Sequence, residues 1–196
     1  MRIVAIRHGE TEWSISGQHT GRTDLPLTDG GRIEANNAAA VLRSWSFDKA
    51  FTSPLVRASE TAALAGFPDA VVDPDLMEWD YGEHEGRRTV DIVAETPGFS
   101  KWLERPPAGE SVEEVGERAD RFLEGLKTPA EGSGSGDVVV FAHGHFLSIL
   151  IARWLDLPAS KGELFPLKTA TLSLLDLYRE RPVLRSLNSE CPEAPA

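Results

Sequence analysis

Short apolar runs alternate with amphipathic stretches along the chain, and this alternation predicts strands that alternate with helices. Ile3–Ile6 is an apolar run that opens on polar residues, as a buried parallel strand does. Lys49–Thr52 is a second strand candidate, and Val138–Ala142 is the most strand-like run in the chain. Thr171–Tyr178 and Pro182–Leu187 are predicted to be closing strands, the second of them at an edge of the sheet.

Capping signals mark where two of the helices begin. Thr28 is a candidate N-cap for a helix that runs to about Arg43. Ser53 followed by Pro54 pairs an N-cap residue type with proline at the first helical position. This dipeptide predicts a second helix that runs to about Ala65.

The rest of the chain is divided into two further helices and two loops. Ser111 and Glu114 form a capping box ahead of apolar residues that share one helical face. Residues 146–155 are predicted to form another helix. Residues 9–29 lack a period and are predicted to form a long loop, and loops of that length are usually functional or disordered. Glycine and serine at 132–136 predict a flexible surface loop.

Strands that alternate with helices predict an α/β fold, a three-layer α/β/α sandwich with a mostly parallel sheet. The 196 residues fit one domain over 1–196, with 189–196 as a loose tail. Ligands of such sheets bind beyond the carboxyl ends of the strands. Strong polar clusters lie at three of these ends: Arg7-His8-Gly9, Ser53 with Arg57, and His143-Gly144-His145. The sequence therefore predicts one functional site at this edge of the sheet.

Composition narrows the function classes. With 20 basic and 31 acidic residues, the net charge is −11, which argues against nonspecific binding of nucleic acid or an anionic membrane. The one cysteine, Cys191, excludes an internal disulfide and a cysteine-based zinc site. The apolar run at the start is too short for a signal peptide, and none is long enough to span a membrane. We therefore expect a soluble, cytoplasmic protein.

An arginine and a histidine follow the first buried strand. Burying the side chains of Arg7 and His8 there costs free energy, unless they bind an anion or take part in catalysis. Imidazole acts as a nucleophile, base or metal ligand near neutral pH, and Gly9 lets backbone approach a ligand closely. The alternative is a strand end whose charges pair with nearby carboxylates.

Arg57 strengthens the case for an anion site. Its side chain leans toward a helix N-terminus, where free N–H groups and the helix dipole favour an anion. With Arg7 it would form a bidentate phosphate clamp, the alternative being a surface ion pair with Glu60. His143 and His145 repeat the pattern of strand, glycine and helix, although His145 also fits an exposed loop.

Two further candidates concern metals and proton transfer. His8, His143 and His145 offer three nitrogen ligands, but neighbouring arginines would repel a cation, so we expect no metal and no cofactor. Glu78 lies between bulky apolar residues. Burial there would favour its protonated form and let it protonate a leaving group, whereas most glutamates are solvated.

Together these motifs resemble the histidine phosphatase superfamily, also called the phosphoglycerate mutase-like family. The resemblance covers nearly the whole chain. It is carried, in order, by Arg7-His8-Gly9-Glu10-Thr11, Thr20-Gly21 with Asp24 to Thr28, Ser53-Pro54-Leu55-Val56-Arg57-Ala58-Ser59-Glu60-Thr61, Glu78 with Gly82 and Glu85-Gly86, and Ala142-His143-Gly144-His145.

The resemblance implies a role for each central residue. His8 would be the nucleophile that becomes phosphohistidine, Arg7, Arg57 and His143 would bind the phosphoryl group, and Glu78 would protonate the leaving oxygen. His8 must be neutral to attack, so we expect a carbonyl or a carboxylate on its other ring nitrogen.

Departures from the mutase pattern favour a phosphatase. Mutases resemble this chain at the core, but typically have asparagine where Ser14 stands and a substrate-binding lysine where Thr89 stands. They also have Glu-Arg-His-Tyr in place of Glu78-Trp79-Asp80-Tyr81. A phosphoglycerate mutase dependent on 2,3-bisphosphoglycerate remains the enzyme alternative. A non-catalytic relative would be expected to lack His8, Arg57 or His143, all of which are present.

Within the family the chain is similar to the fungal sedoheptulose-bisphosphatase branch and to small bacterial acid phosphatases often labelled phosphoglycerate mutases. This similarity implies a phosphomonoester hydrolase acting on sugar phosphates or similar small metabolites. Residues expected to bind substrate or phosphate are Ser14, Thr20, Gly21, Tyr81, Gly144 and His145. Arg22, Arg87 and Arg88 are either the outer wall or solvated surface, and a homodimer is left open.

Overall fold

A mixed sheet of six strands forms the centre of the protein in the computed structural model, which describes residues 1–127 and 136–191. Its order is β3-β2-β4-β1-β5-β6. The strands are β1 (Ile3–Arg7), β2 (Phe47–Thr52), β3 (Val71–Val72), β4 (Asp137–Ala142), β5 (Leu172–Tyr178) and β6 (Arg181–Ser189). The pairs β1–β4, β2–β4 and β2–β3 are parallel, and β5 and β6 are antiparallel, with β6 at the predicted edge.

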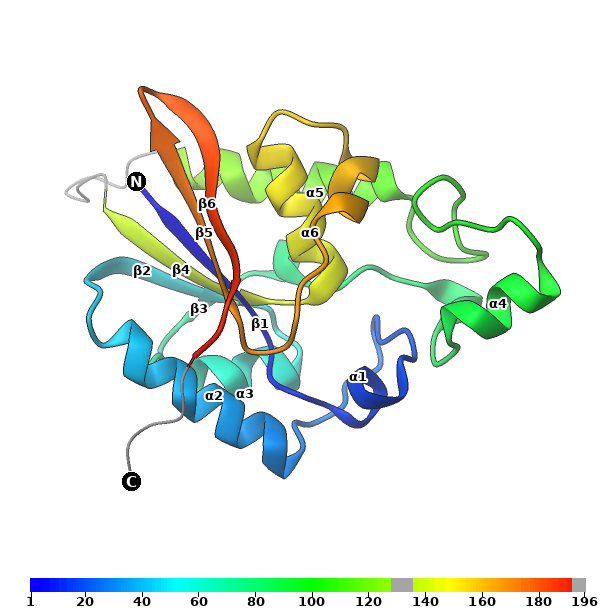
Figure 1. Ribbon diagram of the computed structural model, residues 1–196, viewed down its shortest axis with the longest axis horizontal. Helices are drawn as coiled ribbons and strands as arrows, with labels where there is room; N and C mark the ends of the chain where they lie inside the picture. Colours follow the sequence, from blue (N-terminus) through cyan, green and yellow to red (C-terminus); the bar gives the residue numbers. More distant parts are fainter. Residues whose placement is uncertain (128–135, 192–196) are drawn as a thin grey trace.

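Helices cover both faces of this sheet, as the predicted three-layer sandwich requires. Figure 1 shows α2 and α3 on one face and α5 and α6 on the other, with α4 on a lobe beside the sheet. The helices are α1 (Glu12–Ser16), α2 (Asp29–Leu42), α3 (Val56–Leu64), α4 (Thr89–Glu95), α5 (Val112–Lys127) and α6 (Gly144–Trp154). Short 3-10 helices are η1 (Pro74–Leu76), η2 (Gly82–His84) and η3 (Ala159–Leu164).

The central strands β1 and β4 are apolar except at one end because both of their faces are buried. Ile3 and Ala5 of β1 belong to the core that includes residues of α5 and α6, whereas Val4 and Ile6 belong to the core that includes residues of α2 and α3. This is the two-residue alternation of a strand. Since no polar face is needed, β1 reads as a continuous apolar run, and its polar neighbours begin only where the sheet ends.

The predicted helix starts are confirmed in two cases and wrong in one. Thr28 caps α2 by accepting from the Gly31 amide, and Ser111 and Glu114 form the reciprocal capping box of α5. In contrast, α3 begins at Val56, with Leu55 in the N-cap position. Ser53 lies two residues before that position, where its hydroxyl accepts from the Leu55 amide at 3.3 Å and also contacts a histidine side chain.

The long loop predicted over residues 9–29 contains a helix that the pattern did not reveal. Helix α1 is five residues long, too short to show a period, and a reciprocal pair between Thr11 and Ser14 caps it. Gly9 packs against α2 so closely that a Cβ there would lie 2.4 Å from the Gly31 carbonyl oxygen. The predicted flexible loop falls largely on 128–135, and 192–196 of the predicted tail likewise lie outside the described residues.

Candidate active site

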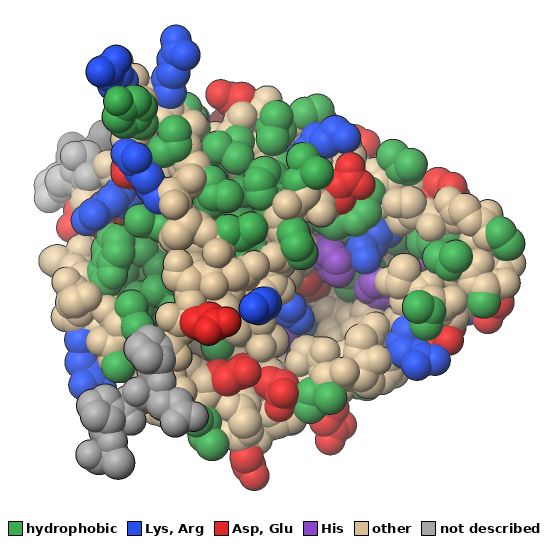
Figure 2. All heavy atoms as spheres, in the orientation of Figure 1, with side chains coloured by type: hydrophobic (Ala, Val, Ile, Leu, Met, Phe, Trp, Pro, Cys, Tyr) green, Lys and Arg blue, Asp and Glu red, His purple; other side chains and the backbone are tan. Residues whose placement is uncertain are grey.

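A cleft of about 270 Å³ opens where β1 and β4 end. Figure 2 shows histidine side chains in this hollow, beside the lobe that carries α4. The predicted site residues that line the cleft are Arg7, His8, Ser14, Thr20, Glu78, Tyr81, Gly144 and His145. Two predicted residues, Arg57 and His143, are completely buried behind these. The chain thus brings together side chains from four distant segments.

His8 directly follows β1 and is held in one tautomer. Its Nδ1 lies 2.7 Å from the carbonyl oxygen of Gly9, which can only accept a hydrogen bond. Nδ1 therefore carries the proton, and Nε2 keeps a free electron pair. Burial, followed by the charges of Arg7 and Arg57, holds the pKa of His8 well below its usual range. The expected carbonyl partner is confirmed, and the imidazole is neutral at neutral pH.

His143 lies next to His8, with 5.3 Å between the ring centroids. It directly follows β4 and occupies the N-cap position of α6. Its Nε2 is 2.8 Å from the Ser53 hydroxyl, whereas its Nδ1 has no hydrogen-bond partner among the described residues. Burial and the charge of Arg57 lower the pKa of His143 well below normal, so that this ring too is neutral.

Arg57 is anchored by three backbone carbonyls and leaves one nitrogen unpaired. Its Nη atoms donate to Thr20, Gly21 and Thr23 at 2.9 to 3.1 Å, which ties the loop after α1 to α3. Its Nε has no partner within the described part of the chain. The alternative ion pair with Glu60 is not formed, because Arg32 takes that carboxylate at 2.7 Å.

Arg7, like Arg57, is anchored by a backbone carbonyl and leaves its Nε unpaired among the described residues. Its Nη1 donates to the Leu167 carbonyl at 2.6 Å, and its Nε is buried without a partner in residues 1–127 and 136–191. Unpaired buried N–H groups are costly, since each loses its hydrogen bonds to water. The Nε–H groups of Arg7 and Arg57 can donate to the oxygens of an anion, and so can Nδ1 of His143 in the tautomer that carries its proton there.

Glu78 is buried at the wall of the cleft and oriented by backbone amides. Its Oε1 accepts from Trp79 at 2.9 Å and from Phe146 at 2.8 Å, and its Oε2 accepts from His145 at 3.1 Å. The amides of His145 and Phe146 are free donors at the start of α6. The solvated alternative for Glu78 is therefore wrong, and its carboxyl group faces the cleft in one orientation.

The outer wall of the cleft is aromatic. The Tyr81 hydroxyl is hydrogen-bonded to Nδ1 of His145, and His19 packs 4.6 Å from the Tyr81 ring. Burial, with smaller effects of Lys101 and His84, lowers the pKa of His19 to about 3. Burial also lowers the pKa of His145 well below its usual range. These two histidines are therefore neutral at neutral pH.

Sequence reasoning placed some of the wall wrongly and missed part of it. Gly21 does not line the cleft, because its amide donates to the Glu85 carboxylate at 2.8 Å. Trp102 does line it, although it was not among the expected site residues. Trp102 follows α4 in a segment without regular structure, so no periodic signal could have identified it. Gln18 and Ser148 were missed in the same way.

The three arginines considered for the outer wall lie outside it. Arg87 pairs with Glu95 at 2.6 Å, Arg88 with Asp91 at 2.7 Å, and Arg22 with Glu110 at 3.4 Å. Near the wall, burial instead lowers the pKa of Lys101 to about 8. Its Nζ lies 5.9 Å from the centre of the Trp102 ring.

Two structural surveys bear on metals and membranes. The described residues contain no group of three or more histidine, cysteine or carboxylate side chains arranged to hold a metal ion. Within the same residues, no helix combines the length and apolar character that crossing a membrane requires.

The buried neutral histidines predict a pH-dependent stability. In the unfolded chain a histidine takes up a proton below about pH 6.5, whereas folded His19 resists protonation down to about pH 3. The free energy of unfolding should therefore fall below pH 6.5, by about 1.4 kcal/mol per pH unit for each such histidine. Urea unfolding of wild type and His19→Gln between pH 7.5 and 4 measures this slope. The variant should show a shallower slope, and equal slopes would contradict the prediction.

Comparison with known proteins was made on sequence and on structure. An acid phosphatase of Mycobacterium tuberculosis is 40% identical over 175 residues, 88% of this chain and 85% of its own. Sedoheptulose 1,7-bisphosphatase of Saccharomyces cerevisiae is 36% identical over 189 residues, 82% of this chain and 69% of its own. Proteins named phosphoglycerate mutase are among the further relatives.

The fold comparison agrees with the sequence comparison. A solved structure of an open reading frame product from M. tuberculosis superposes with a TM-score of 0.91 and 37% identity, over 97% of this chain and 98% of that one. The family model described as histidine phosphatase superfamily (branch 1) matches residues 3–190. A phosphohistidine mechanism is characteristic of that family. By this match, the chain belongs to the histidine phosphatase superfamily, branch 1.

Proposed function

We propose that this protein hydrolyses phosphomonoesters of small metabolites through a phosphohistidine formed on His8. One observation carries the proposal: Arg7, Arg57 and His143 each hold a buried nitrogen without a partner among the described residues, beside a neutral imidazole. A phosphoryl group offers three oxygens to such donors while its phosphorus faces the nucleophile.

In the first step Nε2 of His8 attacks the phosphorus in line with the leaving oxygen. A P–N bond forms as the ester P–O bond breaks. Arg7 and Arg57 neutralise the charge on the equatorial oxygens, and neutral His143 donates a hydrogen bond to them from Nδ1. Glu78 donates a proton to the leaving oxygen, which departs as an alcohol.

In the second step water hydrolyses the phosphohistidine. Glu78, now ionised, takes a proton from the water as its oxygen attacks phosphorus, and the electron pair of the P–N bond returns to Nε2 of His8. Inorganic phosphate leaves and both residues regain their starting states. Three amides fix the position of the Glu78 carboxyl group: Oε1 accepts two of them and Oε2 accepts one, so Oε2 keeps an electron pair that can carry the proton in both steps.

The outer cleft supports a sugar phosphate or a similar small substrate. Its volume of about 270 Å³ is modest. Ser14 and Thr20 offer hydroxyl groups for hydrogen bonds, while Tyr81 and Trp102 offer aromatic surface for the C–H face of a sugar. Relatives named acid phosphatase and sedoheptulose 1,7-bisphosphatase support the same class. The negative net charge is no obstacle, since the local field of the buried arginines acts on the phosphate.

The phosphoglycerate mutase alternative has less support. Thr89 stands where mutases typically have a substrate-binding lysine, and its hydroxyl lies 3.1 Å from His19 Nε2. This position therefore brings no positive charge to the wall. A cytoplasmic location and a homodimer stay predictions.

A substrate panel tests the proposed function directly. Release of phosphate from sugar phosphates of three to seven carbons should be accompanied by little isomerisation of 3-phosphoglycerate in the presence of its bisphosphate primer. We expect kcat/KM for hydrolysis of the best panel member to exceed that for isomerisation by about 10-fold or more, or 1.4 kcal/mol in transition-state stabilisation. Isomerisation faster than hydrolysis would instead establish a mutase.

A further inference from the structure

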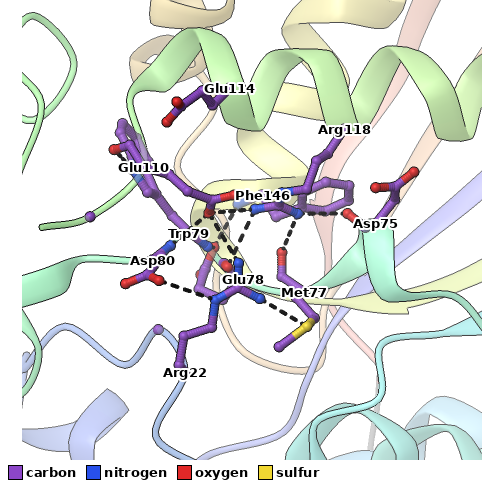
Figure 3. Close-up of polar contacts among 12 residues, drawn as sticks. Arg22, Asp75, Met77, Glu78, Trp79, Asp80, Glu110, Glu114, Arg118 and Phe146 are labelled. Carbon is purple, nitrogen blue, oxygen red and sulfur yellow. Dashed lines mark hydrogen bonds and ion pairs between the residues drawn. The ribbon is translucent and has the colours of Figure 1, made fainter.

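A buried ion pair lies directly behind the loop that carries Glu78. Arg118 of α5 is 8% exposed, and its Nε and Nη2 each donate to the Glu110 carboxylate at 2.9 Å. Figure 3 shows this pair between α5 and residues 75–80. Neither residue lines the cleft, so the pair does not touch substrate.

Arg118 uses all of its hydrogen-bond donors, and most of them hold the backbone of this loop. A guanidinium group has five N–H donors in a planar fork. Besides the two bonds to Glu110, Nη1 donates to the carbonyls of Asp75 at 2.6 Å and Met77 at 2.8 Å. Nη2 also donates to the Glu78 carbonyl at 3.4 Å. The backbone that leads up to Glu78 is therefore fastened to α5 by one side chain.

Glu110 fastens the backbone that follows Glu78. Its Oε2 accepts from the Asp80 amide at 2.9 Å, and its backbone carbonyl accepts from the Trp79 indole at 2.8 Å. Arg118 also lies 5.3 Å over the ring of Phe146, whose amide is one of the donors to the Glu78 carboxylate. The pair therefore contacts both the loop that carries Glu78 and the helix that orients its carboxyl group.

We propose that Arg118, together with Glu110, is a positioning residue that keeps the Glu78 carboxyl group within proton-transfer distance of the leaving oxygen. This inference rests on the proposed role of Glu78. Proton transfer requires a heavy-atom separation of about 2.6–3.2 Å, and a displacement of about 1 Å costs up to 100-fold in rate. Lysine keeps the charge of Arg118 but not its fork of donors, so the loop would lose several of its anchors.

A purely structural ion pair and a positioning pair differ in one measurable respect. Loss of stability or of fold affects every substrate alike, whereas a misplaced acid affects only leaving groups that need a proton. An alkyl phosphate such as glycerol 3-phosphate needs one, since its alkoxide is strongly basic. The 4-nitrophenolate ion leaves without protonation. The ratio of the phosphorylation rates for these two substrates therefore reports on the position of the acid.

The experiment compares Arg118→Lys and Glu110→Gln with Arg121→Lys as a matched control. Arg121 also lies on α5 and pairs with the same loop, but its ion pair reaches the Asp75 carboxylate at 2.7 Å on the surface. In single-turnover measurements of phosphoenzyme formation, Arg118→Lys should lose about 10- to 100-fold with glycerol 3-phosphate. With 4-nitrophenyl phosphate it should lose about 3-fold or less, and Arg121→Lys should change neither rate.

Glu78→Gln separates failure of this inference from failure of the proposed function. If Glu78→Gln shows the same selective loss, and Arg118→Lys adds nothing in the double variant, the positioning role is established. If Glu78→Gln shows it but Arg118→Lys slows both substrates equally, the inference is overturned and the role of Glu78 stands. If Glu78→Gln slows both substrates equally, the proposed acid role of Glu78 and the positioning role of Arg118 both fail. Should Arg118→Lys not fold by circular dichroism, the nearly isosteric Glu110→Gln decides the question by the same criteria.

Discussion

His8→Ala is expected to abolish turnover and to leave no trapped phosphate on the protein. Wild-type enzyme quenched during hydrolysis should carry phosphate that is labile in acid and stable in base, as a P–N bond is. Because the tautomer set by the Gly9 carbonyl leaves only Nε2 of His8 to attack, its removal eliminates the covalent route. Loss of a nucleophile typically lowers kcat by about 10⁴-fold or more.

The measurement is phosphate incorporation from a radiolabelled substrate, with the site identified by mass spectrometry. His84→Gln serves as the control, because His84 is buried against Phe99 and does not line the cleft. It should retain both label and turnover. A label that persists in His8→Ala, or one found on His143, would show that His8 is not the nucleophile.

Arg57→Lys is expected to lower kcat/KM by about 10²- to 10³-fold, the usual cost of losing a donor to transition-state charge. Lysine keeps one positive charge but cannot bond the carbonyls of Thr20, Gly21 and Thr23 while also facing the phosphate. Orthovanadate adopts the geometry of the phosphoryl transition state, so its inhibition constant should rise in proportion.

Arg32→Lys provides the matched control for Arg57→Lys. Arg32 bonds Glu60 of the same helix, α3, but does so at 41% exposure and away from the cleft. Kinetics and vanadate inhibition should stay within about 2-fold of wild type, as for exposed ion pairs. An unchanged vanadate constant in Arg57→Lys would contradict a phosphate-binding role for Arg57, whatever happened to stability.

Much of the fold could be predicted because its signals are local. An apolar run such as Ile3–Ile6 indicates a strand buried on both faces, and Thr28 or the pair Ser111 and Glu114 indicates where a helix begins. The start of α3 was predicted wrongly for a physical reason. Ser53 fits a cap by residue type, but its hydroxyl lies 2.8 Å from His143, ninety residues away. The same hydroxyl accepts from the Leu55 amide at 3.3 Å in a local side-chain turn, so the helix begins only after Leu55.

The chemistry of the candidate site could be predicted from the sequence, but the residues that hold and surround its reactive groups could not. Arginines and histidines at strand ends indicate an anion site from their residue types alone. The role of Arg118 could not be inferred, because the bonds that define it reach residues 40 to 43 positions away. Trp102 lacked any periodic signal. Such residues become visible only when the backbone that they contact has been placed.

By itself, the amino-acid sequence determined the family, the layered α/β fold and the reactive groups, since each depends on residue types in a particular order along the chain. Only the tertiary structure decided that His8 keeps Nε2 free, that three buried nitrogens meet beside it, and how Glu78 is held. The physical reason is that hydrogen bonds act over about 3 Å. Contacts that short between distant segments exist only after the sheet and its helices have assembled.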